Sequence, residues 1–283
     1  MTEKLTERDE PPWLAVRIEP SGDRQRVIDA LFGAGSLGVQ EEGDTIITHF
    51  PPGTLAGRIE DVVRVADPHA RITTGSAPNA DWSEWRASVR AHTLGKITIA
   101  PPWLAGKNPE SLDVIIDPAM AFGTGEHATT RGVVRLMQQL PSIPEVVADL
   151  GSGSAVLSIC AAKLGAKRVV AIELDHDAIG NAEENVGVNG VEGIVHVIEG
   201  DAGLLLPLVS PAGLVLANII SSILVELLPA IHAAVSPGGH AILSGILVDE
   251  RPVIIGAVER GGWRIVSEDM EEGWWSVLIE RPR

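Results

Sequence analysis

A short glycine-containing segment in the second half of the chain has the residue types of a ligand-binding turn. It reads DLGSGSA, from Asp149 to Ala155, and separates an apolar run at 146–150 from an apolar helical stretch. Glycines at such a junction let the backbone approach a ligand closely and expose the free N–H groups at the start of a helix. We therefore predict that Gly151 and Gly153 contact a bound molecule. Asp149 is placed to attract a positively charged group on that molecule, directly or through water.

Acidic residues also follow the next two predicted strands. Glu173 ends the strand VVAIE, 20 residues after Gly153, the spacing at which an acid accepts hydrogen bonds from ribose hydroxyls. Asp201 follows the third strand, within EGDA, and is placed to contact the edge of an adenine. Because the carboxyl ends of parallel strands meet at one edge of a sheet, these residues converge on one crevice. They predict a cofactor that contains a nucleoside.

The glycine spacing distinguishes between two kinds of nucleoside cofactor. A dinucleotide site commonly has the pattern G-x-G-x-x-G, whose third glycine packs the helix against the strand. Counted from Gly151, that third position is Val156, which disfavours a nicotinamide-dependent oxidoreductase. S-adenosylmethionine has no phosphate and requires only close backbone approach and polar partners for its amino-acid end. The pattern therefore favours S-adenosylmethionine and methyl transfer, and the oxidoreductase is kept as an alternative.

Strands and helices alternate through the region that carries these residues. We predict strands at 146–150, 168–173, 194–199, 214–218 and 240–244, with helices at 155–164, 177–185, 222–235 and 249–260. This alternation indicates a parallel sheet covered on both faces. Two further strands, at 263–268 and 274–279, have no helix between them and should form an antiparallel hairpin at the sheet edge. The order predicts an α/β fold, a seven-stranded Rossmann-like class I methyltransferase domain.

The first half of the chain has a different pattern. Predicted strands at 13–19, 37–42, 45–50 and 70–74 are separated by helices at 23–32 and 55–65. The order βαββαβ is that of a small ferredoxin-like α+β domain. We therefore divide the chain into a disordered tail over 1–12, a ferredoxin-like domain over 13–78, a linker over 79–110 and the methyltransferase domain over 111–283.

Composition argues against several classes of protein. The chain has 283 residues, of which 45% are hydrophobic, and a net charge of −16. No segment approaches the ~20 apolar residues of a membrane span, and the charged N-terminus lacks the apolar region of a signal peptide. We therefore expect a cytoplasmic protein without a membrane partner. The single cysteine, Cys160, excludes an internal disulfide and a cysteine-based metal site, and we predict no metal. The negative charge makes direct nucleic-acid binding unexpected.

Two further segments resemble the PrmA family, the methyltransferases of ribosomal protein L11. DPAMAFGTGEHATT, from Asp117 to Thr130, is similar to the family pattern DPG-x-AFGTG-x-H-x-TT. ANIISSILVELLP, from Ala217 to Pro229, is similar to ANIL-x-x-x-L-x-EL-x-P. PGGHAILSGIL, from Pro237 to Leu247, also resembles its counterpart in the family. The resemblance extends from about Asp81 to Leu247, and few other methyltransferases carry the FGTG-x-H-x-TT segment.

The resemblance implies an N-terminal domain that recognises the substrate. It also implies a catalytic domain that methylates lysine ε-amines and an N-terminal α-amine of a ribosomal protein. Thr130, Gly151, Glu173 and Asn218 match the family's cofactor-binding residues by motif position. The chain departs from the family pattern at Ala155, where glycine is usual, and at Glu173, where aspartate is usual. Relatives that methylate lysines of other proteins share much of this motif set, so such a substrate remains an alternative.

Asn218, at the end of the fourth predicted strand, is the candidate catalytic residue. Methyl transfer requires an amine held in line with the sulfur–carbon bond, and the side-chain oxygen of Asn218 could orient that amine; alternatively, Asn218 only holds its loop. His127 is a candidate proton acceptor for which we favour a structural role. The loop at 121–130, with two glycines, is expected to close over the cofactor. We expect the protein to be a monomer. Besides the methyltransferase and the oxidoreductase, a third hypothesis is a non-catalytic binding module with the same fold.

Overall fold

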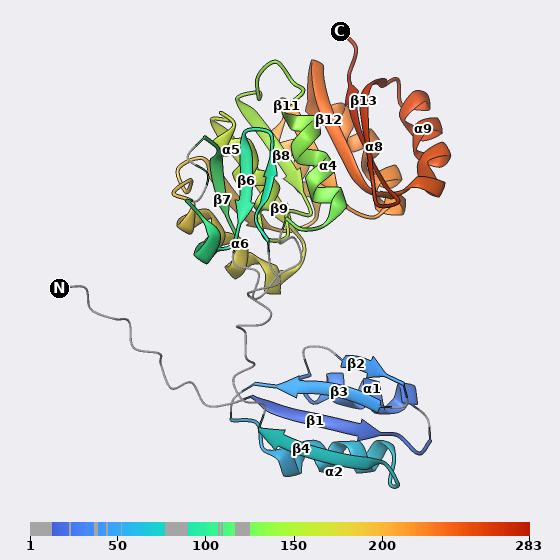
Figure 1. Ribbon diagram of the computed structural model, residues 1–283. Coiled ribbons are helices and arrows are strands. Elements are labelled where there is room, and N and C mark those ends of the chain that lie inside the picture. Colours follow the sequence, from blue (N-terminus) through green and yellow to red (C-terminus); the bar gives the residue numbers. More distant parts are fainter. Residues whose placement is uncertain are drawn as a thin grey trace, which may run out of the picture. The chain divides into compact units, whose positions relative to one another are not determined.

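A computed structural model of the chain describes three stretches: residues 13–76 apart from 23, 37, 38, 44 and 52, residues 90–116 apart from 107 and 109, and residues 125–283. The predicted tail at 1–12 and most of the FGTG loop, 117–124, lie outside the described residues. Contacts between residues divide the chain into two compact units, residues 1–88 and 89–283 (Figure 1). Each unit is described here by itself.

In its described residues, the first unit is an antiparallel sheet with two helices. Among the residues described, its strand order is β2-β3-β1-β4, and each pairing is antiparallel. Val16 and Ile18 of β1 pack with Ile59 and Val63 of α2 in a buried cluster that belongs to this unit alone. The arrangement is that of the ferredoxin-like fold, as predicted. The elements are β1 (Leu14–Glu19), α1 (Arg24–Gly33), β2 (Val39–Glu42), β3 (Thr45–Phe50), α2 (Ala56–Ala66) and β4 (Arg71–Ser76).

The second unit is built on a mixed sheet. In the described part of the chain its seven strands follow the order β10-β9-β8-β11-β12-β14-β13. They are β8 (Val146–Leu150), β9 (Arg168–Glu173), β10 (Val195–Glu199), β11 (Ala212–Asn218), β12 (Val235–Leu247), β13 (Arg264–Glu271) and β14 (Trp274–Glu280). The first five strands in the sheet are parallel, and β14 runs antiparallel between β12 and β13. The predicted class I methyltransferase sheet, with its terminal hairpin, is confirmed.

Helices cover both faces of this sheet (Figure 1). One buried cluster joins the sheet to α4 (Ala128–Met137), α5 (Val156–Lys163) and α6 (His176–Val188). A second cluster joins the opposite face to α7 (Ala202–Val209), α8 (Ser221–Ala234) and α9 (Arg251–Arg260). In the described residues no helix is long and apolar enough to span a membrane.

Two of these helices were absent from the sequence-based assignment. α4 begins at Ala128, so Thr130 lies in its first turn and not in a loop as expected. α7 contains Pro207 and leaves Leu204 and Leu208 each 77% exposed, so it lacks the alternation of polar and apolar faces that marks a surface helix.

A small three-stranded sheet packs against the face that carries α4 and α5. It consists of β5 (His92–Leu94), β6 (Ile97–Ala100) and β7 (Leu112–Ile115), with the short helix η1 (Pro102–Leu104) before β7. Ile97, Ile99 and Val114 belong to the same buried cluster as α4 and α5. β5 and β6 fall within 79–110, the range expected to be a linker, so the described part of that range carries strands of the second unit.

Candidate active site

The strand order of the large sheet reverses beside β8, which has β9 on one side and β11 on the other. In doubly wound sheets, ligands bind beyond the carboxyl ends of the strands at such a switch point. Glu173 and Asn218 are the last residues of β9 and β11, the two neighbours of β8. The topology therefore brings the segments that follow β8, β9 and β11 to one edge of the sheet.

The turn after β8 has a backbone that only glycine adopts readily. Gly151 and Gly153 have φ angles of +64° and +51°, in the left-handed region that glycine tolerates best. The N–H of Gly151 donates to the carbonyl of Ile172 at 2.8 Å. A Cβ added to Gly151 would lie 2.6 Å from Cγ2 of Ile219. The two glycines leave the backbone of this turn without side chains, and the side chain of Ile219 packs against Gly151.

Ala155 shows how the chain accommodates its departure from the family's glycine pattern. It has φ 63° and ψ 17°, directly before α5, and its side chain is fully buried. A non-glycine residue in this conformation carries a strain of roughly 1–2 kcal/mol. The left-handed geometry is therefore retained although the glycine is replaced.

Glu173 is bound to the glycine turn. Its Oε2 accepts a hydrogen bond from the N–H of Gly153 at 2.7 Å, and its Oε1 accepts from Leu174 at 2.8 Å and Asp175 at 2.9 Å. Asp175 is the N-cap of α6 and accepts from the N–H of Asp177. The carboxylate of Glu173 thus fixes the loop after β9 against the loop after β8, and the helix-capping role belongs to Asp175.

Asp149 lies beneath the turn and is almost completely buried, with 1% of its surface exposed. Its Oδ2 accepts a hydrogen bond of 2.6 Å from the hydroxyl of Ser158 on α5. Its Oδ1 has no hydrogen-bond partner among the described residues. Burial raises the pKa of this carboxyl from 3.8 to about 6, a rise that the hydrogen bond from Ser158 opposes and the nearby charge of Glu173 increases. A buried carboxylate without full compensation is expensive for the fold, and a cation above the turn would offset part of that cost.

Replacement of Asp149 by asparagine should stabilise the free protein above pH 6. Between pH 3.8 and about 6 the folded state binds the proton that the unfolded state has released, so the contribution of Asp149 to stability falls as the pH rises. The difference in pKa corresponds to about 3 kcal/mol, reached above pH 7. Urea unfolding of both chains between pH 5 and 8 measures the effect. Ser158→Ala, which removes only the hydroxyl donor, is the control and should lower stability. A stability difference between Asp149→Asn and wild type that does not grow with pH would contradict this assignment.

Thr130 and Asn218 meet across the start of α4 and the end of β11. The amide nitrogen of Asn218 lies 3.5 Å from the hydroxyl oxygen of the buried Thr130. His127 is the N-cap of α4, where its ring nitrogen accepts from the N–H of Thr129, and its ring lies edge-on to Trp274 at 4.9 Å. His127 therefore makes a structural contact at the start of α4. The hydroxyl of Ser244, beside Asn218 on β12, donates to the carbonyl of Thr129 at 3.2 Å.

Ion pairs hold α4 against the terminal hairpin. Arg131, whose side chain is 10% exposed, pairs with Glu271 at 2.9 Å, and Arg135 pairs with Asp269 at 2.5 Å and with Glu271 at 2.7 Å. These contacts are made by planar guanidinium groups on partly buried carboxylates, the geometry in which ion pairs are strongest. The helix that carries Thr130 is therefore fixed to β13 at two successive turns.

Asp201 has a structural contact in addition to the role predicted for it. It is the N-cap of α7, and its Oδ1 accepts from the N–H of Leu204 at 3.1 Å. It follows β10, whose Glu199 pairs in register with Glu173. Within the described residues no group of acidic, histidine or cysteine side chains has the arrangement of a metal site.

Two residues of this region were not singled out from the sequence. Ser158 holds Asp149, and Ser244 connects β12 to the start of α4. Both serines lie in otherwise apolar runs and are fully buried, and a buried hydroxyl must have a partner. A serine within an apolar run of the sequence was therefore the signal that could have identified both residues.

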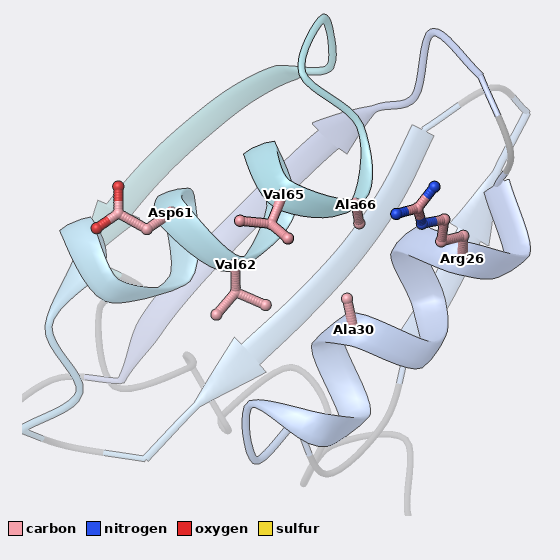
Figure 2. Close-up of a pocket in the computed structure, with 6 residues that line it drawn as sticks. All are labelled: Arg26, Ala30, Asp61, Val62, Val65 and Ala66. Atoms are coloured by element: carbon pink, nitrogen blue, oxygen red, sulfur yellow. The ribbon is translucent and has the colours of Figure 1, made fainter.

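The first unit has a pocket of its own between α1 and α2 (Figure 2). It is lined by Arg26, Ala30, Asp61, Val62, Val65 and Ala66. None of these residues is among the site residues predicted from the sequence, and the strand ends described above belong to the other unit. The chemistry is therefore expected at the sheet edge and not in this pocket.

The order of the seven-stranded sheet, with the glycine turn after β8 and the acid after β9, defines a class I methyltransferase that uses S-adenosylmethionine. A family model of ribosomal protein L11 methyltransferase (PrmA) matches residues 19–282, and the chain belongs to this family.

Individual relatives agree with this assignment. The ribosomal protein L11 methyltransferase of Symbiobacterium thermophilum is 32% identical over 268 residues, covering 83% of this chain and 85% of the relative. That of Geobacter sulfurreducens is 34% identical over 279 residues, covering 93% and 91%. The crystal structure of ribosomal protein L11 methylase from Lactobacillus delbrueckii subsp. bulgaricus, 30% identical, superposes with a TM-score of 0.62 over 69% of this chain and 100% of that one.

Proposed function

We propose that the protein transfers methyl groups from S-adenosylmethionine to lysine ε-amines, and to the N-terminal α-amine, of ribosomal protein L11. The observation that carries the proposal is the extent of the family match, which runs from residue 19 to residue 282 and so includes both units of the chain. A catalytic unit on a shared fold would by itself leave the substrate open. A match that includes the small N-terminal unit supports the same protein substrate as in the family.

We infer that the edge beside β8 holds the cofactor, which supplies an activated methyl group when bound. The backbone at Gly151 and Gly153 approaches its amino-acid end, and the buried charge of Asp149 attracts its ammonium from below the turn. Glu173 accepts hydrogen bonds from the ribose hydroxyls, using the carboxylate lone pairs that are not engaged by the backbone N–H groups of Gly153, Leu174 and Asp175. Asp201 contacts the adenine, and Thr130 closes the site from α4.

Asn218 orients the methyl acceptor in this proposal. Its amide nitrogen is directed at Thr130, which leaves the side-chain oxygen to accept a hydrogen bond from the incoming amine. A lysine in water has a pKa of ~10.4 and is protonated at neutral pH. Transfer from water into a closed pocket favours the neutral amine, which is the nucleophile. Correct placement of that amine can lower the free-energy barrier to methyl transfer by several kcal/mol.

The proposal is tested by incubating purified L11 with the protein and S-adenosylmethionine labelled in its methyl group. Transfer of label to L11, and not to a lysine-rich unrelated protein, is expected. Cofactor binding without any transfer would favour the non-catalytic module, and binding of NADH in place of S-adenosylmethionine would favour the oxidoreductase. Label on another ribosomal protein alone would support the alternative of a different lysine substrate.

We also propose that the N-terminal unit recognises the substrate, and this predicts the behaviour of a truncated chain. Removal of residues 1–88 should leave a folded protein that binds S-adenosylmethionine with unchanged affinity, because the two units have separate buried clusters. Methylation of intact L11 should fall below detection, because a pocket for one amine cannot by itself select one protein. Calorimetry and label transfer measure the two properties on one sample.

Two outcomes of that truncation would contradict the division of roles. Full activity on intact L11 would show that recognition does not require the first unit. Loss of cofactor binding together with activity, in a fragment that still unfolds cooperatively, would show that the first unit contributes to the cofactor site.

We further propose that the protein acts as a cytoplasmic monomer without direct affinity for nucleic acid. The net charge of −16 opposes contact with phosphates and suits a basic protein substrate. Sedimentation of the purified protein with and without ribosomal RNA tests the oligomeric state and the lack of affinity for nucleic acid.

A further inference from the structure

Four apolar side chains are exposed where β11 and β12 end, next to Asn218. Ile220 is 62% exposed and Ile223 is 43% exposed, at the start of α8. Leu247, the last residue of β12, is 43% exposed, and Val248 beyond it is 40% exposed. We call these four side chains the apolar lip. Exposed apolar residues that gather at one place commonly mark an interaction site.

Hydrogen bonds join the two segments that carry the apolar lip. The carboxylate of Glu250 accepts from the hydroxyl of Ser221 at 2.6 Å and from the N–H of Leu247 at 2.9 Å. Ser221 adjoins Ile220, so one carboxylate joins the start of α8 to the end of β12. The N–H of Val248 donates to the carbonyl of Gly273 at 3.0 Å, which ties the lip to the turn of the terminal hairpin.

Acidic side chains border the lip. Asp249 and Glu250 follow Val248 directly, and Glu226 lies three residues after Ile223 on α8. The two hydrogen bonds from Ser221 and Leu247 lower the pKa of Glu250, so this carboxylate is charged at neutral pH. In the described part of the chain no cationic side chain lies within ion-pair distance of these three acids. The surface is therefore apolar at its centre and negative at its border.

The lip is continuous with the site that holds the methyl acceptor. Ile220 lies two residues after Asn218, and Leu247 lies three residues after Ser244, the residue that pairs with Asn218 in register. A lysine side chain has an apolar stem and a cationic end. A lysine that reaches Asn218 from a folded protein brings neighbouring residues of that protein close to the sheet edge that carries this surface.

We propose that the apolar lip is the docking surface for the segment of the substrate protein that carries the acceptor lysine, a positively charged segment with an apolar residue beside the lysine. The inference rests on the proposed function as a protein methyltransferase. Apolar contact supplies affinity at the centre of such an interface, and the acidic border attracts the basic segment and excludes acidic ones. The N-terminal unit selects the protein, and the lip selects the segment within it.

Steady-state methylation of purified L11 by the full-length chain tests the proposal. The double variant Leu247→Ser with Val248→Ser should raise KM for L11 roughly tenfold, the size of effect expected when central interface contacts are truncated. The kcat at saturating L11 and the Kd for S-adenosylmethionine should stay within about twofold, because the variant leaves the cofactor edge unchanged. Val188→Ser, at a valine that is 59% exposed on α6, is the control and should change nothing.

A charge variant provides a second arm that does not depend on the apolar residues. Asp249→Lys should also raise KM for L11 and should weaken its dependence on ionic strength. An unchanged KM in both variants, with the wild type active, would overturn the docking surface and leave the proposed function standing. A wild type that transfers no methyl to any protein would remove the proposed function first. A wild-type dimer that the double variant dissociates would assign the lip to a second copy of the chain and overturn the proposal.

Discussion

Replacement of Glu173 by alanine is expected to weaken S-adenosylmethionine binding by about 10- to 100-fold. A hydrogen bond to a charged acceptor contributes roughly 1.5–3 kcal/mol, which corresponds to that change in affinity. The structure adds a second cause. Glu173 accepts from the N–H groups of Gly153, Leu174 and Asp175, so its loss also releases the turn that we propose holds the cofactor. Calorimetric titration with S-adenosylmethionine measures the effect.

Glu199 supplies a matched control for this experiment. It pairs with Glu173 in register on the next strand, and its carboxylate forms an exposed ion pair with His176 at 2.8 Å. Glu199→Ala should therefore leave the affinity unchanged. Glu173→Asp keeps the charge with a shorter side chain and should fall between alanine and wild type. Unchanged affinity in Glu173→Ala would reject the ribose assignment, and binding of NADH by that variant would revive the oxidoreductase hypothesis.

Replacement of Asn218 by alanine is expected to reduce methyl transfer by about a hundredfold, because small errors in the placement of reacting groups have effects of this size. Cofactor affinity should change much less, since the proposed contact of Asn218 is with the acceptor amine. Single-turnover transfer and calorimetric affinity, measured on one preparation, separate the two quantities. A companion variant, Thr130→Val, keeps the shape of Thr130 and removes the hydroxyl that faces Asn218, so it measures how much that hydroxyl contributes to the position of Asn218.

The comparison of these variants tests the assignment of Asn218. Asn181→Ala, on the outer helix α6, removes an asparagine that bonds to Asn185 and should leave transfer unchanged. If transfer and cofactor affinity fall equally in Asn218→Ala, then Asn218 is a cofactor residue and does not orient the acceptor. If neither falls, Asn218 only holds its loop.

The pattern of alternating strands and helices was sufficient to predict both folds, since most strands of the large sheet are apolar runs with a turn after them. The two helices that were not predicted, α4 and α7, lack a clear pattern of this kind. α4 begins inside a motif that suggested a loop, and its cap is His127, an uncommon capping residue. α7 is apolar on all sides and contains a proline, so its hydrophobic periodicity carries no signal. β5 has only three residues, too few for its hydrophobic alternation to be recognised, whereas the apolar run that forms β6 reads as a strand that ends before Pro101.

The site was predictable in its backbone and less so in its side-chain contacts. The ends of β8, β9 and β11 follow from the order of strands, and so does the meeting of Glu173 with the glycine turn. The burial of Asp149 depends on which way its side chain leaves the strand, and only the packing of α5 with Ser158 decides that. The contact between Thr130 and Asn218 joins residues 88 positions apart, and no local pattern records it.

Mass spectrometry of L11 after incubation with the full-length protein and S-adenosylmethionine tests the central claim most directly. The account predicts that intact L11 gains mass in steps of one methylene group, with the additions located by peptide mapping on lysine side chains and on the N-terminal amine. With Glu173→Ala, at a cofactor concentration near the wild-type Kd, the gain should be about 5- to 50-fold slower, as the expected loss of affinity requires, while Glu199→Ala should behave as wild type. Unmodified L11, in a sample whose protein binds S-adenosylmethionine normally, would contradict the account.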